Sequence, residues 1–281
     1  MESTLDIIRR RHSARSFDGR SLDERLREGI RGLLVTPVPC PFGTRPRFAL
    51  LAGAGTSDIP GTSSGRIGTY GVIKDAPAYI VGCCDRRQPY AFVDFGYAME
   101  AIVLGVTAMG LGSCWLGGLF DRSNAGATLS LGEGEIVPAM SPVGYEASRR
   151  TIADRIIRFS AKSHQRKPWN QLFFRGSWDT PLDALPGGNS HAEPWAEVLE
   201  AVRLGPSASN KQPWRIVLSG DMSAMHLYLY EERVYTRAIP GVLLQGMDAG
   251  IAMRHADEAL STLGFKGSWE RLEKEPCPGP A

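Results

Sequence analysis

The chain has 281 residues, of which 43% are hydrophobic and 22% are charged, so it can bury a large core without disulfide or metal staples. The 32 Lys and Arg residues exceed the 30 Asp and Glu residues by only two, which argues against a dedicated nucleic-acid-binding protein. Length predicts one large domain or two ordinary ones. Glycine is enriched at 32 residues, which indicates many turns or a backbone that approaches a ligand closely.

The positions of the cysteines and histidines indicate the cellular compartment and whether a metal site is expected. The five cysteines are scattered without a C-x-x-C pair, as expected for reduced thiols in a reducing compartment. The first residues are acidic and polar, so no signal peptide is visible and we expect a cytoplasmic protein. The five histidines never fall at metal-ligand spacing, and we expect no metal site.

The first part of the chain predicts helices and strands in alternation. Leu5 and Ile8 share a helical face, and Ser21-x-x-Glu24 is a capping box that predicts the start of a second helix. A buried helix is expected at 94–109. Strands are expected at 48–52, 78–82, 113–116 and 135–140.

One apolar run in this part has two readings. Residues 101–120 carry no charge over twenty positions, which is long enough for a transmembrane helix. A helix buried in a large core gives the same run, and five of its residues are glycine. The related segment in the second part carries Arg254, His255 and Asp257, which favours a core helix, so we expect no membrane span.

The second part begins after a basic stretch at 149–167 and a turn-forming cluster at 187–190. A helix is predicted from Pro194, which suits the first helical position. A loop at 205–213 follows. Strands are then expected at 214–218 and 225–230 and a helix at 248–263.

The two parts repeat one another without a gap over 22 positions. The matched pairs are Asp94 and Asp248, Gly96 and Gly250, Met99 and Met253, Gly110 and Gly264, and Trp115 and Trp269. We therefore interpret the chain as two diverged copies of one unit, with residues 1–175 as the longer N-terminal half and residues 176–281 as the shorter C-terminal half.

Three segments contain residue types that could bind a ligand. Arg11, His12, Ser13 and Arg15 place cations and a hydroxyl at a helix end, which suits a phosphate or the carbonyl edge of a heterocycle. A solvated basic turn explains them equally well. The segment 205–214 offers short polar side chains between prolines, as an ordinary helix-to-strand loop also does.

The third segment contains Gly110, Gly112 and the pair Gly117-Gly118, where bare backbone N–H groups can approach a planar ligand or form a tight turn. Neither the dinucleotide fingerprint G-x-G-x-x-G nor a P-loop is present. The G-x-S-x-G match at 61–65 lies within a loop, so we do not interpret it as a nucleophile elbow.

Taken together, the R-H-S-x-R-x-F, P-V-G-Y, D-x-G…G-L-G and P-S-A-S-N-x-Q-P-W strings resemble the FMN-dependent nitroreductase family, in particular its tandem-repeat branch described as "putative TM nitroreductase". The resemblance covers about residues 5–170 and 192–270. It implies an α+β fold of the nitroreductase type, with FMN bound between two subunits or, here, between two half-copies.

The resemblance also implies roles for particular residues. Arg11, His12, Ser13 and Arg15 would hold the phosphate, ribityl chain and pyrimidine edge of FMN, and the backbone around Leu116, Gly117 and Gly118 would face the flavin N5 edge. Arg166 would also reach the phosphate, with His164 a weaker candidate. The residues that would close the site from the other half are Pro206, Ser207, Ser209 and Asn210.

The two halves depart from the family pattern in complementary ways. Between Pro39 and Pro46 the first half has Cys40, Phe42 and Gly43 where the second half has its serines and asparagine. The second half keeps only a faint basic motif at Arg175 and no second P-V-G-Y. We therefore expect an intramolecular pseudodimer with one FMN site, able to function as a monomer.

The implied function is an FMN-dependent oxidoreductase that takes hydride from NADH or NADPH and reduces a small organic acceptor of the nitroaromatic or quinone type. The flavin carries the redox chemistry, so no catalytic side chain is required. Two alternatives stay open: other flavin chemistry such as dehalogenation, and a flavin-binding or sequestering protein without turnover.

Overall fold

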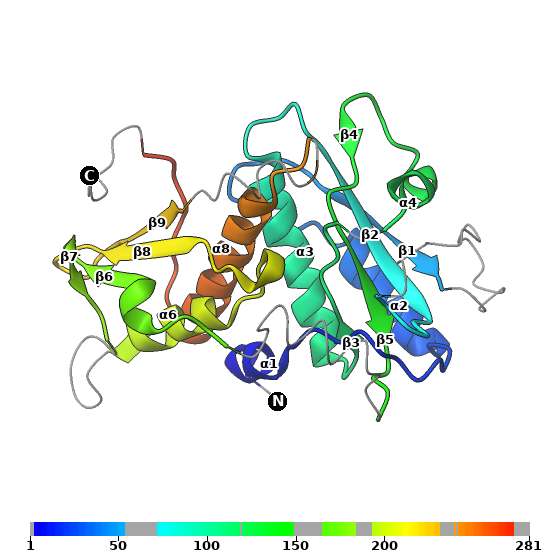
Figure 1. Cartoon of the computed structure of the whole chain (residues 1–281), viewed down its shortest axis with the longest axis horizontal. Helices are drawn as coiled ribbons and strands as arrows, with labels where there is room; N and C mark the ends of the chain where they lie inside the picture. Colours follow the sequence, from blue (N-terminus) through cyan, green and yellow to red (C-terminus); the bar gives the residue numbers. More distant parts are fainter. Residues whose placement is uncertain are drawn as a thin grey trace.

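The computed structural model describes residues 3–53, 72–118, 120–148, 165–183, 193–230, 239 and 241–272. Two β-sheets lie at opposite ends of the molecule, and the long helices α3 (Ala91–Ala108) and α8 (Leu244–Thr262) lie side by side between them (Figure 1). The fold is α+β, as predicted, and is assembled from two similar halves around these central helices.

The N-terminal sheet has the order β1-β2-β5-β3 and is antiparallel throughout. Its strands are β1 (Arg47–Ala52), β2 (Ala78–Asp85), β5 (Met140–Gly144) and β3 (Gly112–Ser113), and β4 (Glu135–Ile136) pairs with the end of β2. Alternate side chains of β1 and β2 point to opposite faces. One face packs against α2 (Glu24–Val35) and α3, and the other packs against α4 (Arg122–Leu129).

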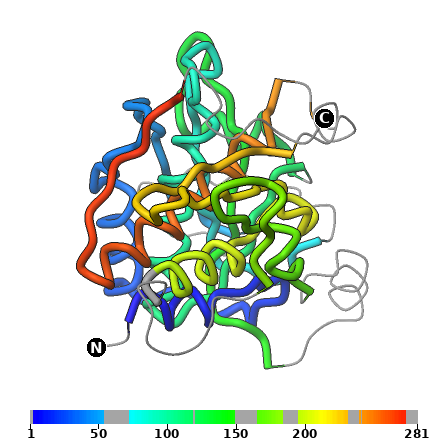
Figure 2. The backbone as a smooth tube through the Cα atoms, turned by 90° about the vertical axis from the view of Figure 1, so that its left-hand side faces the viewer, coloured from blue at the N-terminus to red at the C-terminus, as the bar shows by residue number. Residues whose placement is uncertain are grey.

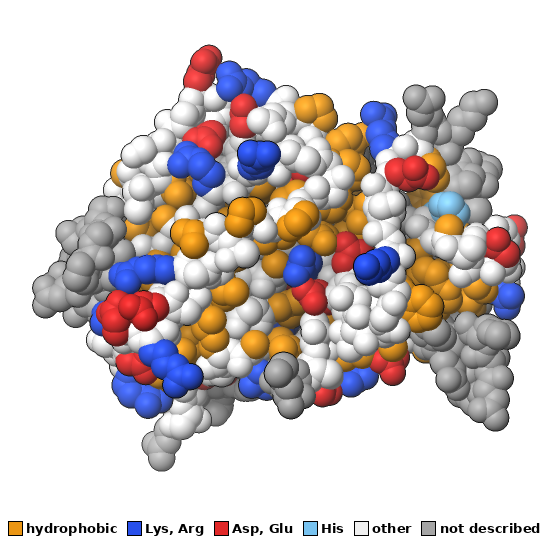
Figure 3. All heavy atoms as spheres, turned by 180° about the vertical axis from the view of Figure 1, so that it is seen from behind, with side chains coloured by type: hydrophobic (Ala, Val, Ile, Leu, Met, Phe, Trp, Pro, Cys, Tyr) orange, Lys and Arg blue, Asp and Glu red, His pale blue; other side chains and the backbone are white. Residues whose placement is uncertain are grey.

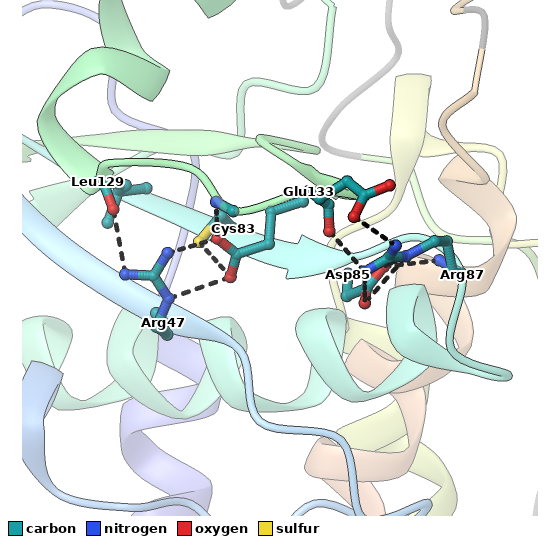
Figure 4. Close-up of polar contacts among 8 residues, drawn as sticks. Arg47, Cys83, Asp85, Arg87, Leu129 and Glu133 are labelled. Carbon is teal, nitrogen blue, oxygen red and sulfur yellow. Dashed lines mark hydrogen bonds and ion pairs between the residues drawn. The ribbon is translucent and has the colours of Figure 1, made fainter.

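Charged side chains fasten β4 and its turn to this sheet (Figure 4). Arg47 Nε donates to Glu135 Oε1 at 3.1 Å, and the Cys83 thiol donates to the same oxygen at 3.6 Å. Arg87 donates to Asp85 and to the Glu133 carbonyl oxygen. These contacts join strands and turns within the N-terminal half, so we interpret them as structural.

The C-terminal sheet has the order β7-β6-β8-β9. Its strands are β6 (Phe173–Arg175), β7 (Ser177–Pro181), β8 (Trp214–Leu218) and β9 (Met225–Leu229). The β8–β9 hairpin corresponds to β1–β2, whereas β6 joins the outer edge of β8 in parallel. The segment that leads out of the N-terminal half therefore contributes a strand to the C-terminal sheet.

The core beneath this second sheet combines residues from both ends of the chain. Leu5 and Ile8 of α1 (Thr4–Arg10) pack in it beside α6 (Glu193–Leu204), α8 and β8. The segment after α8 then runs back along the flank of the molecule (red in Figure 2), where Arg271 lies over the Tyr90 ring of the first half. On the face shown in Figure 3, basic and acidic side chains are interspersed.

The two repeat glycines lie where α3 and α8 cross. A Cβ atom on Gly96 would overlap the carbonyl oxygen of Met247, and a Cβ on Gly250 would overlap that of Val93. These are equivalent contacts, because Val93 and Met247 are separated by the same 154 positions as Asp94 and Asp248. The D-x-G repeat therefore marks the pseudo-twofold relation between the halves. Although α3 is apolar and long enough to cross a membrane, 78% of it is buried inside the protein.

Most predicted elements are present, with several differences. The strand predicted at 113–116 is reduced to β3, which contains only Ser113 of the predicted residues, and α3 begins three residues earlier than predicted. The helix after residue 20 is capped by Asp23, whose side chain accepts from Leu26 N, so the Ser21 capping box was wrong. The predicted strand 135–140 is split into β4 and the start of β5. The helix α8 begins four residues earlier than predicted, and α4, β6 and β7 were not predicted.

Candidate functional site

The basic segment after α1 runs along the edge of the N-terminal sheet. Ala14 N donates to the Ser113 carbonyl oxygen at 2.8 Å, and Ser13 forms a bridge with Ser113 of β3. Successive side chains of an extended segment alternate in direction. Arg11 is buried at 7% exposure and Arg15 is half-buried, whereas the His12 side chain is 42% exposed and lies 2.9 Å from Glu146 Oε2. Of this group, His12 is therefore turned toward a surface carboxylate.

Arg11 is a buried cation with an unsatisfied donor. Among the described residues its Nε has no hydrogen-bond partner. Burial lowers the pKa of Arg11, and the charge of Glu100 raises it in partial compensation. A buried guanidinium nitrogen without a partner is costly, so this position favours an incoming anion or hydrogen-bond acceptor.

Arg166 arrives from the segment that joins the two halves and lies within electrostatic reach of Arg11. Burial, followed by the charges of Arg11 and Arg203, lowers the pKa of Arg166 to about 10. Its Nη1 donates to Asn210 Oδ1 at 2.6 Å and its Nη2 to the Leu204 carbonyl oxygen at 2.9 Å. Three predicted site residues, Arg11, Arg166 and Asn210, are thus brought together from both halves of the chain.

The second loop, Pro206–Pro213, has a strained backbone at its centre. Ser209, Asn210 and Gln212 have φ angles of 46°, 55° and 47°, which non-glycine residues rarely adopt. The Ser207 hydroxyl accepts from Gln212 N at 2.9 Å, and Ser209 is exposed. Clustered strain of this kind is common at ligand-binding sites.

The joining segment clamps the second loop. Asn210 Nδ2 donates to the Gln165 carbonyl oxygen at 2.7 Å, and Lys167 N donates to Gln212 Oε1 at 2.9 Å. Pro206 is buried beneath the loop. The loop of the C-terminal half is therefore held directly by residues that follow the N-terminal sheet. His164 lies outside the described residues.

The glycine pair of the first half faces the second half. Leu116 exchanges backbone hydrogen bonds with Met140, and Arg122 donates to the Gly117 carbonyl oxygen. A Cβ on Gly117 would lie 3.0 Å from Leu244 at the start of α8, and one on Gly118 would lie 3.4 Å from Ile239. Leu116 is buried and Gly118 is exposed, so this turn runs from the core to the surface at the junction.

A buried polar cluster, which the sequence analysis did not predict, links the two halves of the chain. Glu100 and His255 are both fully buried, with Glu100 Oε1 2.9 Å from His255 Nε2. Trp115 donates to Glu100 Oε2 at 2.6 Å, and His255 Nδ1 lies 2.8 Å from the Ala201 carbonyl oxygen. A carbonyl oxygen can only accept, so His255 Nδ1 is the donor to Ala201, and Nε2 faces the carboxyl group of Glu100.

Trp269, the repeat counterpart of Trp115, has different partners. Trp269 donates to Asp257 Oδ1 at 2.9 Å, and the Tyr97 hydroxyl donates to Asp257 Oδ2 at 2.7 Å. In the first loop, Pro39–Pro46, the Phe42 ring stacks on Tyr90 with centroids 4.4 Å apart. Aromatic packing therefore occupies the counterpart of the strained second loop.

Comparison with known proteins gives a consistent assignment. The family model described as "Putative TM nitroreductase" matches residues 3–260. The crystal structure of a putative nitroreductase from Thermotoga maritima MSB8 is 20% identical and superposes with a TM-score of 0.57, covering 97% of this chain and 91% of that chain. At this identity the likeness shows the fold.

Other similar structures cover about half of this chain. A nitroreductase family protein from Clostridium novyi NT is 22% identical, with a TM-score of 0.40, and covers 53% of this chain and 87% of that chain. A nitroreductase with bound FMN from Bacteroides fragilis NCTC 9343 is 19% identical, with a TM-score of 0.40, and covers 54% of this chain and 92% of that chain. Among curated proteins, none matches this chain.

Proposed function

Because this chain belongs to the putative TM nitroreductase family, we propose that it is an FMN-dependent oxidoreductase that takes hydride from NADH or NADPH and reduces a small organic acceptor such as a nitroaromatic compound or a quinone. The observation that carries the proposal is the convergence of Arg11, Arg166 and Asn210 at the junction of the halves. Two mutually repelling guanidinium groups in a buried setting favour an anionic ligand.

The residues present fit such a cofactor at its charged end. Arg11 has a buried donor without a partner among the described residues, and Arg166 adds a guanidinium group within electrostatic reach of it. Arg15 follows Arg11 by four positions in the same basic segment. We assign the phosphate, the ribityl chain and the pyrimidine edge to Arg11, Ser13, Arg15 and Arg166. Cations at that edge stabilise negative charge that develops on a reduced ring.

The second loop and the glycine turn complete the proposed site. Ser207, Ser209 and Asn210 offer short polar groups from the C-terminal half, and the backbone of Gly117 and Gly118 approaches from the N-terminal half. When bound, FMN would supply the hydride-transfer chemistry. His12 is the weakest of the proposed ligands, because its ring contacts Glu146 at the surface.

The proposal includes one composite site per chain. The first loop has no serine or asparagine at the matching positions, and its Phe42 ring is already stacked on Tyr90. The mirror-image position therefore lacks these polar groups, and its loop packs on an aromatic ring instead. A single chain supplies every group that the proposed site needs, so a monomer suffices. Among the described residues no disulfide joins the four cysteines, which supports a cytoplasmic location.

Absorbance spectroscopy of the purified protein, followed by anaerobic titration with NADH or NADPH, tests the proposal. We expect a yellow protein that the pyridine nucleotide bleaches and that an added quinone or nitroaromatic compound reoxidises. A yellow protein that is never bleached would support a flavin-binding role without turnover. A colourless protein that takes up no added FMN would refute the flavin proposal.

Two substitutions test the composite site. Arg11→Met and Asn210→Ala should each reduce FMN occupancy, because the residues belong to different halves of one site. Arg9→Met is the matched control, since Arg9 is 53% exposed and pairs with Asp6 on the surface. Full FMN occupancy in either Arg11→Met or Asn210→Ala would contradict the composite site.

A further inference from the structure

The two repeat aspartates hold corresponding loops. Asp94 lies in the first turn of α3 and accepts backbone hydrogen bonds from the first loop, and Asp248 lies one turn into α8 and accepts one from the second loop. Both residues are buried, with exposures of 0% and 4%. The repeat has therefore preserved a carboxylate beneath each loop, although only the second loop keeps the polar residues of the proposed site.

The hydrogen bonding of the two carboxylates differs. Asp94 uses both oxygens, accepting from Phe42 N at 3.0 Å and from Thr44 N at 2.8 Å. Asp248 accepts only from Ala208 N, at 2.9 Å on Oδ1, and its Oδ2 receives no hydrogen bond from the described residues. Pro41 stands where Ala208 stands in the second loop and has no N–H, so the first loop must use other amides.

The Asp248 hydrogen bond lies at the most strained part of the second loop. Ala208 sits between Ser207 and Ser209, and the left-handed residues Ser209 and Asn210 follow it directly. On α8, Asp248 follows Leu244 by four positions, which places both on the same helix face. A Cβ on Gly117 would lie 3.0 Å from the Leu244 side chain. Asp248 therefore connects the second loop to the helix face that packs on the glycine pair.

We propose that Asp248 is the positioning residue of the second loop: its carboxyl group anchors the Ala208 amide, and so holds Ser207, Ser209 and Asn210 in the conformation that the proposed FMN site needs. This inference rests on the proposed function for its consequence in cofactor binding. The anchoring itself is independent of any ligand. Asp94 performs the same structural task beneath a loop that has lost its ligand-binding side chains.

The raised pKa of Asp248 gives its anchoring role a pH dependence that a role in packing alone would not have. Burial raises the pKa of Asp248 to about 7, and the Ala208 N–H lowers it only in part. No charged side chain contributes to this shift. Because the folded pKa lies above the unfolded value, the folded state holds an extra proton between pH about 4 and about 7. The stability contribution of Asp248 is therefore present at pH 4 and is lost as the pH rises to 7.

Hydrogen–deuterium exchange at the backbone amides of residues 207–212, in the protein without added cofactor, tests the anchoring. Asp248→Ala should accelerate exchange of the Ala208 amide by about tenfold or more, because its acceptor is removed. Asp248→Asn should stay within about threefold of wild type, since an amide oxygen can still accept from Ala208. Asp94→Ala is the matched control and should leave the second loop unchanged.

Replacing each aspartate with asparagine tests whether the two carboxyl groups contribute differently to stability. Asp94→Asn should lower the midpoint of thermal unfolding by about 5 °C, because its amide NH₂ would face a backbone N–H. Asp248→Asn should be tolerated and should remove the contribution of this residue to the loss of stability between pH 4 and pH 7. Equal destabilisation by the two variants, or an unchanged pH profile in Asp248→Asn, would contradict the proposal.

Flavin fluorescence titration then links the anchoring to cofactor binding. Asp248→Ala should weaken FMN binding by about tenfold, whereas Asp94→Ala should change it by less than about twofold. If wild type binds no FMN, the proposed function fails and the exchange measurement alone decides on Asp248. If wild type binds FMN but the Ala208 amide exchanges at the wild-type rate in Asp248→Ala, the positioning role fails and the proposed function stands.

Discussion

The two loops show how one repeated design has diverged. The second loop is polar, has three non-glycine residues with positive φ, and is clamped by the joining segment through Asn210 and Gln212. The first loop has glycine at the position of Asn210, stacks Phe42 on Tyr90 and uses both oxygens of Asp94. In the second loop the positive φ angles fall on non-glycine residues, whereas in the first loop the positive φ falls on Gly43, which adopts it without strain.

A similar contrast exists between the two tryptophan–carboxylate clusters. Trp115 and Trp269 occupy equivalent positions, and each donates to a carboxylate on the long helix of its own half. The acceptor Glu100 is fully buried, is paired with His255 and interacts electrostatically with Arg11, whereas Asp257 is half-buried and is paired with the neutral Tyr97. The cluster near the proposed site is therefore the more deeply buried one, and it is the one that interacts with Arg11.

The largest expected effect is on the stability of the buried cluster. Glu100→Ala leaves His255, the Trp115 indole N–H and Arg11 without their acidic partner, and we expect a loss of about 4 kcal/mol in unfolding free energy. Asp257→Ala should cost clearly less, because Asp257 is closer to solvent. Chemical denaturation of both variants measures the difference, and equal losses would contradict the distinction between the clusters.

The helix crossing should be almost as sensitive. Gly96→Ala and Gly250→Ala each place a methyl group against a backbone carbonyl that cannot move without separating α3 from α8. We expect a loss of about 3 kcal/mol for either variant. Gly32→Ala in α2 is the control: a Cβ there meets nothing within 4 Å, so the change should stabilise the helix slightly. Similar unfolding midpoints for all three variants would disprove the crossing geometry.

Cofactor affinity should distinguish the basic groups of the two halves. Arg166→Met should weaken FMN binding by about thirtyfold, since a buried guanidinium is removed from the proposed phosphate site. Arg175→Met alters the faint basic motif of the second half, where Arg175 is exposed, and should leave FMN binding unchanged. Isothermal titration with FMN compares the variants, and a comparable loss in both would indicate a second functioning site.

The smallest effect on stability is expected for a substitution in the Trp269–Asp257 cluster, which is not part of the proposed FMN site. Tyr97→Phe removes the hydrogen bond to Asp257 and should cost about 1 kcal/mol in stability. Because Tyr97 belongs to the Trp269–Asp257 cluster, FMN affinity should remain at the wild-type value. A marked loss of FMN binding in this variant would show that the two clusters are not functionally distinct.

The arrangement of two related halves could be predicted from the sequence, because the residues that repeat are ones that the helix crossing requires. Gly96 and Gly250 are required by the close crossing of α3 and α8, so the D-x-G pairs revealed the two halves. The Glu100–His255 pair could not be predicted, since its partners lie 155 positions apart and carry no local motif. The crossover strand β6 was missed because a three-residue strand is too short to show periodicity.

The central claim is that one chain forms a single composite FMN site between its halves. The number of FMN molecules bound per chain, measured by flavin absorbance on protein whose mass in solution is known, tests this claim most directly. We predict one FMN per chain in a monomeric protein. Two FMN molecules per chain, or one FMN shared between two chains, would contradict the claim.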